Sequence, residues 1–245
     1  LDEDSDEVLL ELAAYLEGIG FYPQAAQIYE KLAPKFPEVY INLAAIAGED
    51  GLIEEAFDYL ENIGSESEWY VSALALKADL YQMEGLTDVA REKLLEARSY
   101  SDDPLLIFGL AELDSELEND LEAIKGYAQL DNRAIYDQTG ISTYQRIGLA
   151  YARLGKFESA IEFLEKALEL EYDDQTAFEL ASLYFDQEDY QKAVLYFKQL
   201  DTISPDFEGY EYGYSQALHK EHQTEEALKI AQQGLSKNPF ETRLL

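Results

Sequence analysis

The chain has 245 residues, of which 47% are hydrophobic and 13% aromatic, so it can bury a substantial core. Its 51 acidic and 18 basic residues give a formal net charge of -33, and a field of this sign repels nucleic acids and anionic membranes. Because the sequence contains no cysteine, disulfides, thiolate metal sites and cysteine nucleophiles are excluded.

In chain order, the sequence predicts a series of short amphipathic helices joined in pairs by tight turns. Residues 144–170 show the pattern best: Tyr144, Ile147 and Tyr151 share one helical face, and Gly155 ends that helix. A second apolar stripe begins at Phe157. Two short helices joined by so tight a turn are expected to pack antiparallel.

The same pattern recurs along the whole chain, and one buried-type alanine marks each copy. These alanines are Ala25, Ala56, Ala90, Ala123, Ala160, Ala193 and Ala227, at intervals of 31, 34, 33, 37, 33 and 34 residues. Twelve positions before each alanine stands a small residue, namely Ala13, Ala44, Ala78, Ala111, Gly148, Ala181 or Ser215. The predicted repeats cover about 6–36, 37–70, 71–103, 104–140, 141–173, 174–207 and 208–241.

This arrangement resembles the tetratricopeptide repeat, which has a period of about 34 residues and the pattern W-x2-L-G-x2-Y, A-x3-F, P. The resemblance covers nearly the whole chain and is closest from Tyr144 to Ala167. It implies an all-α fold: a right-handed superhelical solenoid of antiparallel helix pairs, forming one domain over residues 1–245. In such a solenoid the first helix of each pair lines a concave groove.

The fourth repeat matches this family least well. Asp114 and Asp120 stand where the family usually has aromatic residues. The interval after this repeat is the longest, because it contains DNRAIYDQTG (131–140). We interpret this segment as a longer loop between repeats and as the place where the solenoid bends.

The two ends of the sequence also suggest a larger protein. Stacked helix pairs need a polar cap at each end, but the last repeat closes at Pro239 and is followed by FETRLL, which looks like the start of another helix. The sequence therefore predicts that the natural protein continues beyond Leu245, or that the uncapped C-terminal end is covered in a dimer. The chain begins at Leu1, and we interpret it as a fragment of a bacterial protein.

No motif in the sequence indicates catalysis. His219 and His222, the only histidines, are three residues apart, and His222 falls at a predicted turn, so no metal site is expected. Glu162, Glu165 and Glu169 lie on one exposed helical stripe and have no pocket that would set their pKa values apart. The sequence predicts a protein that is not an enzyme and that holds no cofactor and no metal.

The resemblance implies that a ligand is contacted by the second, fifth, sixth, ninth, twelfth and thirteenth positions of each repeat. The candidate residues are Glu7, Glu11, Glu38, Asn42, Glu49, Asp79, Phe108, Glu112, Arg146, Phe178, Glu179, Phe185, Tyr212 and Gln216. Arg153, Asp186, His219 and Lys220 occupy further positions of this kind. The first four repeats supply mostly acids and the last three add aromatic and basic residues, although aromatics at the fifth position also belong partly to the core.

We therefore expect a non-catalytic scaffold that binds a basic or amphipathic segment of another protein. The expected partner is neither nucleic acid nor an anionic membrane. The acidic tail of a chaperone is also rejected, since only Asn42 matches the basic and polar clamp that such a ligand needs. The absence of an apolar span and of a cationic leader favours a cytoplasmic location.

Several alternatives stay open. In one alternative, the acidic residues take no part in binding and only keep a long solenoid soluble. The chain would equally suit a peptide-sensing regulatory domain that controls an attached effector, or a helper domain of an enzyme or of an envelope assembly machine.

Overall fold

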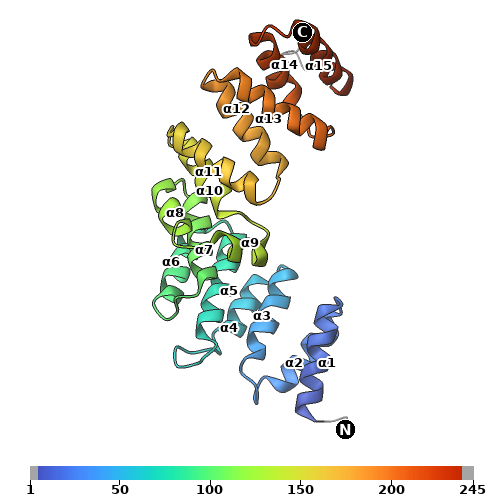
Figure 1. Ribbon diagram of the computed structural model, residues 1–245. Helices are drawn as coiled ribbons and strands as arrows, with labels where there is room; N and C mark the ends of the chain where they lie inside the picture. The colour runs from blue at the N-terminus through green and yellow to red at the C-terminus, as the bar shows by residue number, and fades with distance from the viewer. Residues whose placement is uncertain (1–4, 239–245) are drawn as a thin grey trace. The chain divides into compact units, whose positions relative to one another are not determined.

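The computed structural model describes residues 5–238. Within this range the chain forms fifteen helices and no strand, which confirms the all-α class (Figure 1). It divides into two compact units, Leu1–Asn119 and Asp120–Leu245. Unit 1 contains α1 (Asp6–Gly18), α2 (Tyr22–Leu32), α3 (Val39–Glu49), α4 (Ile53–Leu60), α5 (Tyr70–Met83), α6 (Thr87–Arg98) and α7 (Pro104–Glu116). Unit 2 contains α8 (Asp120–Tyr127), α9 (Asn132–Thr139), α10 (Thr143–Arg153), α11 (Phe157–Leu170), α12 (Asp174–Asp186), α13 (Tyr190–Ile203), α14 (Tyr210–Lys220) and α15 (Thr224–Lys237).

Helices pack in consecutive pairs inside each unit. In unit 1 the pairs are α1 with α2, α3 with α4, and α5 with α6, while α2 packs on α3 and α6 on α7. In unit 2 the pairs are α10 with α11, α12 with α13, and α14 with α15, and α8 packs on α10. Because the second helix of one pair packs on the first helix of the next, a continuous core runs through each unit. That both units form one uninterrupted solenoid stays a prediction.

Seven turns between consecutive helices share one backbone conformation. One residue at each turn has a positive φ between 59° and 82°, and the next amide donates to the carbonyl five residues earlier, as in a Schellman motif. These residues are Gly20, Gly51, Gly85, Glu118, Gly155, Glu188 and His222. The predicted helix end at Gly155 and the predicted turn at His222 are both confirmed.

Small residues allow the paired helices to approach closely. All seven marker alanines of the repeats are buried, and Ala160 has no exposed surface. A Cβ atom at Gly148 would lie 2.7 Å from Cγ of Leu164, so only glycine fits there without a shift. The small residues that recur in the sequence therefore lie where the two helices of a pair come closest in the core.

The segment 131–140 is not the loop that the sequence suggested. It forms α9, whose N-cap Asp131 accepts a hydrogen bond from the amide of Ala134, at 2.8 Å. Gly140 ends the helix in the left-handed conformation. The buried side chain of Asn132 then ties α9 to α10, since its Oδ1 accepts from Thr143 Oγ1 at 2.9 Å. The expected bend at this segment stays a prediction.

The two aspartates that weaken the fourth repeat form ion pairs with arginines of neighbouring repeats. In unit 1, Arg91 Nε lies 2.7 Å from Oδ1 of Asp114, which is 6% exposed. In unit 2, Arg153 NH2 lies 2.5 Å from Oδ1 of Asp120, which is 7% exposed. A charged pair thus joins adjacent repeats where the family usually places an aromatic ring.

Candidate binding surface

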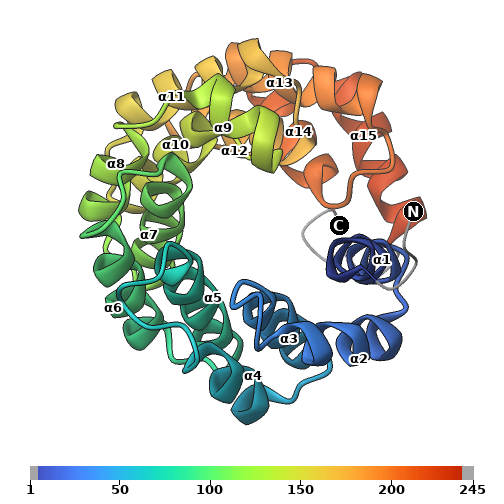
Figure 2. The ribbon, with the colours of Figure 1, turned by 90° about the horizontal axis from the view of Figure 1, so that it is seen from below.

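The first helices of the pairs lie on the inner side of each unit. Figure 2 shows α1, α3, α5 and α7 along the inner side of unit 1, with α2, α4 and α6 outside them. The same order holds within unit 2, where α10, α12 and α14 lie inside α11, α13 and α15. This is the side from which the resemblance expects ligand contacts.

Four candidate residues of unit 1 are exposed acids on these inner helices. Glu7 and Glu11 belong to α1, Glu49 ends α3, and Asp79 lies on α5. Since α3 and α5 pack against each other, Glu49 and Asp79 lie on neighbouring helices. Partial desolvation raises the pKa of the Asp79 carboxyl, although its side chain reaches solvent.

The other candidates of unit 1 are partly or fully engaged inside the protein. Asn42 is half-buried, and its Nδ2 donates to Glu17 Oε2 at 3.0 Å. Glu38 and Glu112 are half-buried, and Phe108 is buried. Phe108 therefore belongs to the core. The sequence pattern had predicted this for some aromatic residues at the fifth position of the repeat.

The aromatic candidates of unit 2 also contribute to packing. The ring of Phe178 lies 6.2 Å from that of Phe197 and 5.5 Å from that of Phe207, and the ring of Phe185 lies 5.4 Å from that of Tyr190. Both side chains remain half-buried, so each keeps an accessible part. The remaining candidates Arg146, Glu179, Tyr212 and Gln216 are also half-buried. Of the further positions, Arg153 is tied to Asp120, whereas Asp186, His219 and Lys220 are exposed.

The two units differ strongly in charge. The sequence of unit 1 holds 28 acidic and 6 basic residues, which gives a net charge of -22. Unit 2 holds 23 acidic and 12 basic residues, for a net charge of -11. A cationic ligand is therefore attracted more strongly to unit 1.

Tyrosine hydroxyls, rather than basic residues, satisfy several of the partly buried carboxylates. Tyr29 donates to Glu17 at 2.6 Å, and this carboxylate also receives the amide of Asn42. Glu165 accepts from two hydroxyls, those of Tyr184 at 2.6 Å and Tyr196 at 3.2 Å. Burial, followed by the nearby Glu165 carboxylate, raises the pKa of Tyr196 to about 12. Tyr184 and Tyr196 thus join their repeat to the preceding one, while Tyr29 joins the two helices of its own repeat.

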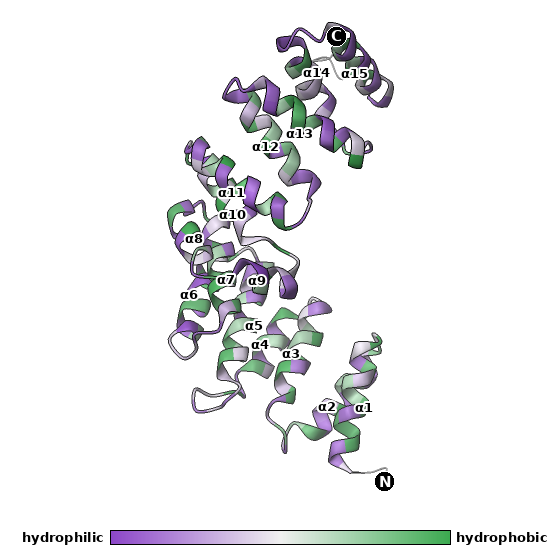
Figure 3. Ribbon diagram, in the orientation of Figure 1, coloured by the Kyte–Doolittle hydropathy of each residue, from purple (hydrophilic) through white to green (hydrophobic). Residues whose placement is uncertain are grey.

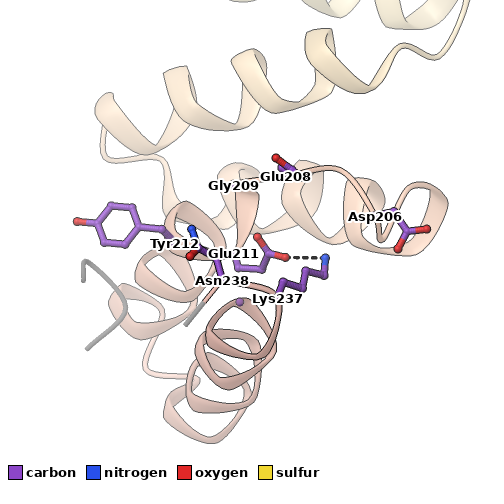
Figure 4. Close-up of a pocket in the computed structure, with 8 residues that line it drawn as sticks. Asp206, Glu208, Gly209, Glu211, Tyr212, Lys237 and Asn238 are labelled. Carbon is purple, nitrogen blue, oxygen red and sulfur yellow. Dashed lines mark ion pairs between the residues drawn. The ribbon is translucent and has the colours of Figure 1, made fainter. Parts of the chain in front are cut away.

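A pocket of about 690 Å³ lies in the last repeat of unit 2, beside α14 and the end of α15 (Figure 4). Its floor carries the buried carboxylate of Glu211, which forms an ion pair with Lys237 Nζ at 2.6 Å. The same ammonium also donates to the carbonyl of Pro205. Asp206 and Glu208 add exposed carboxylates to its lining. Sequence reasoning missed Glu211 because one acid among 51 carries no signal by itself.

Neither a metal-binding cluster nor a membrane-spanning helix occurs in the part of the chain that the structure describes. Among residues 5–238 no group of three or more His, Asp or Glu side chains is placed to hold a metal ion. None of the helices described is both long and apolar enough to cross a membrane. The prediction about FETRLL and the chain end lies outside the described residues.

The seven left-handed turns, the buried small residues and the paired helices define a helical-repeat protein. A tetratricopeptide-repeat model matches residues 141–174 and 175–207, and a model described as YpiA-like tetratricopeptide repeats matches residues 82–135. Residues 82–135 and 141–207 thus match tetratricopeptide repeats, and proteins of the tetratricopeptide-repeat superfamily generally act as non-catalytic scaffolds for other proteins.

Among known proteins, the chain is similar to the TPR repeat-containing protein YpiA of Bacillus subtilis strain 168. The two are 29% identical over 192 residues, which cover 78% of this chain and 45% of YpiA. The chain thus matches less than half the length of this relative.

Solved structures share the fold. The C-terminal part of a TPR repeat-containing protein from Cytophaga hutchinsonii has a TM-score of 0.72 at 16% identity, covering 96% of this chain and 97% of that one. The APC/C hetero-tetramer Cut9–Hcn1 contains a chain with a TM-score of 0.61 at 18% identity, covering 89% of this chain and 43% of that one.

Proposed function

We propose that the chain is a non-catalytic scaffold that binds a basic or amphipathic segment of another protein on the inner side of its helix pairs. The charge of the inner helices in unit 1 carries this proposal. Glu7, Glu11, Glu49 and Asp79 are exposed there, and none of the candidate positions of this unit holds Lys or Arg. A cationic segment would meet carboxylates without competing bases and would be steered towards them by the field of the unit.

Unit 2 supports the second part of the proposal. Its candidate positions offer the half-buried rings of Phe178, Phe185 and Tyr212. A segment bound to unit 2 would place apolar side chains against these rings. Neighbouring helices supply the contacts, since α12 and α14 pack against each other.

The test is a binding measurement by fluorescence anisotropy with a labelled Lys- and Leu-containing peptide and an acidic peptide of the same length. The variant Glu7→Gln/Glu11→Gln/Asp79→Asn removes three inner charges. The control Asp58→Asn/Glu61→Gln/Glu92→Gln removes three exposed charges from the outer helices and their ends, so both variants have the same net charge.

We expect the basic peptide to bind at least about tenfold more weakly to the inner-helix variant than to the control, because local charges outweigh the distant field at a Debye length of about 8 Å. Affinity for the basic peptide should also fall as salt is raised. Equal weakening by both variants would mean that the acids act only through net charge and would refute the proposed surface.

A further inference from the structure

A second surface of unit 1 carries exposed apolar side chains at one repeated position. Phe21, Leu52 and Leu86 each follow the left-handed residue of their turn directly, and they are 50%, 51% and 48% exposed. Ile19 and Met83, in the first and third of these turns, are 48% and 63% exposed. In Figure 3 the turn between α1 and α2 has the colour of hydrophobic residues. These five residues are called the turn edge.

The fold does not require apolar residues at this position. The equivalent residues of the other four turns are Asn119, Lys156, Asp189 and Gln223. All four turns keep the same left-handed conformation and the same hydrogen bond. Single exposed leucines are common on protein surfaces, but apolar residues at the same place in three consecutive repeats form a row.

The turns of the row follow one another along unit 1. The three helix pairs that carry it are consecutive, with α2 packed on α3 and α3 packed on α5. Packed helices lie about 8–10 Å apart, so we expect the turns that follow α3 and α5 to be separated by about that distance. Seven residues of an α-helix rise by about 10.5 Å, which matches one step of the row.

The charge around the row selects the partner. The aligned turn segments 18–25, 49–56 and 83–90 contain six acidic residues and no Lys or Arg. Each equivalent segment of the last three repeats, 153–160, 186–193 and 220–227, contains at least one Lys or Arg. The second and third turns of the row therefore carry acidic and no basic residues, and the first turn carries no charge, which together complement a cationic surface.

We infer that the turn edge of unit 1 binds an amphipathic helix of a partner protein, with apolar side chains about every seven residues and Lys or Arg beside them. The apolar side chains contact the turn edge, and the basic ones face acids such as Asp50 and Glu84. The five residues of the turn edge are not among the candidate residues of the inner side, although Glu49 borders both surfaces, and the inference does not depend on the proposed function.

The probe is a designed helical peptide of about 18 residues, made of Leu and Lys, with a photoreactive residue on its apolar face. The edge variant Phe21→Asn/Leu52→Asp/Leu86→Gln introduces residue types that equivalent turns already contain. The control Leu195→Gln/Leu228→Gln removes two leucines that are 60% and 58% exposed and that belong to no such row. A Glu-for-Lys peptide and a scrambled peptide test the charge and the apolar face.

We expect the edge variant to bind the probe at least about tenfold more weakly, because apolar anchors dominate such interfaces, and the control to bind within about twofold of the unaltered chain. Crosslinks should fall in residues 18–22, 49–53 and 83–87, and both comparison peptides should bind more weakly. The inner-helix variant should leave these crosslinks in place. If that variant abolishes them, or if the edge variant keeps full affinity, the turn edge is not the site, while the proposed function stands.

Two other outcomes would also overturn the inference. Self-association that disappears in the edge variant, measured by sedimentation, would identify a second copy of this chain as the occupant. A clearly lower melting temperature of the edge variant would show that these side chains serve the fold. We expect a monomer at micromolar concentration and an unchanged melting temperature.

Discussion

The ion pair between Arg91 and Asp114 gives the sharpest test of how the repeats hold together. Its geometry is bidentate, with Nε–Oδ1 at 2.7 Å and NH2–Oδ2 at 3.4 Å. The aspartate side chain is only 8% exposed, whereas the arginine side chain is 30% exposed. The variant Arg91→Leu therefore leaves the more deeply buried partner as an uncompensated carboxylate.

Breaking a fully buried pair typically costs about 3–5 kcal/mol. Here the Asn119 amide, 3.4 Å from Oδ1, still reaches the carboxylate, so we expect a loss of about 2–3 kcal/mol in the free energy of unfolding. Tyr81, Tyr151 and Tyr184 occupy the position equivalent to Asp114 in other repeats. The double variant Arg91→Leu/Asp114→Tyr should thus lie within about 1 kcal/mol of the unaltered chain.

Urea unfolding followed by the fluorescence of Trp69, the single tryptophan, reports on unit 1. With a slope of about 2 kcal/mol per molar, the midpoint should fall by about 1 M for the single variant and recover in the double variant. If Arg91→Leu leaves the midpoint unchanged, or if the double variant is as unstable as the single one, the pair does not join these repeats as argued.

Three further predictions concern the turns, the packing and the tyrosines. Replacing the left-handed His222 by glycine should stabilise the chain by about 0.5–1 kcal/mol in a urea titration followed by circular dichroism, because glycine adopts this conformation without strain. Gly148→Ala should cost about 1–3 kcal/mol by the same measurement, because its Cβ would meet Leu164, whereas Gly18→Ala in open space on α1 should not destabilise. The raised pKa of half-buried tyrosines such as Tyr196, about 12, implies stability that is complete below pH 10 and is lost between about pH 10 and 12, as tyrosinate absorbance and circular dichroism recorded together would show. A glycine variant that destabilises, an alanine at position 148 without cost, or a stability that does not change over this pH range would each contradict the reasoning.

The repeat spacing allowed much of the fold to be predicted from the sequence. A marker such as Ala160 must be small, because two helix axes approach at it, and this demand recurs at each copy of the repeat. Gly155 carried a second signal, since the left-handed turn that follows the first helix favours glycine. Helix α9 was missed because eight residues are too few to show amphipathic spacing, although the N-cap Asp131 and the left-handed Gly140 mark both of its ends.

The candidate site was less predictable than the fold. Phe108 and Asp79 both occupy candidate contact positions of their repeats, the fifth and the ninth, yet one is buried and the other exposed. Whether such a position is buried depends on what packs over it, which the sequence pattern alone does not show. The ion pair of Asp114 with Arg91 could not be predicted from the sequence either, because the two residues are 23 positions apart and belong to different repeats.

The tyrosines explain how so acidic a chain folds without losing its surface charge. Carboxylates between repeats need hydrogen-bond donors, and a basic donor would cancel their charge. In this chain neutral donors do much of this work: Glu17 receives Tyr29 and Asn42, and Glu165 receives Tyr184 and Tyr196. A neutral donor satisfies the carboxylate and leaves the net charge unchanged, so the strong negative field of the chain survives packing and stays available to a cationic partner. Tyrosines that donate to carboxylates in this way allow the chain to keep its net charge of -33 when the repeats pack.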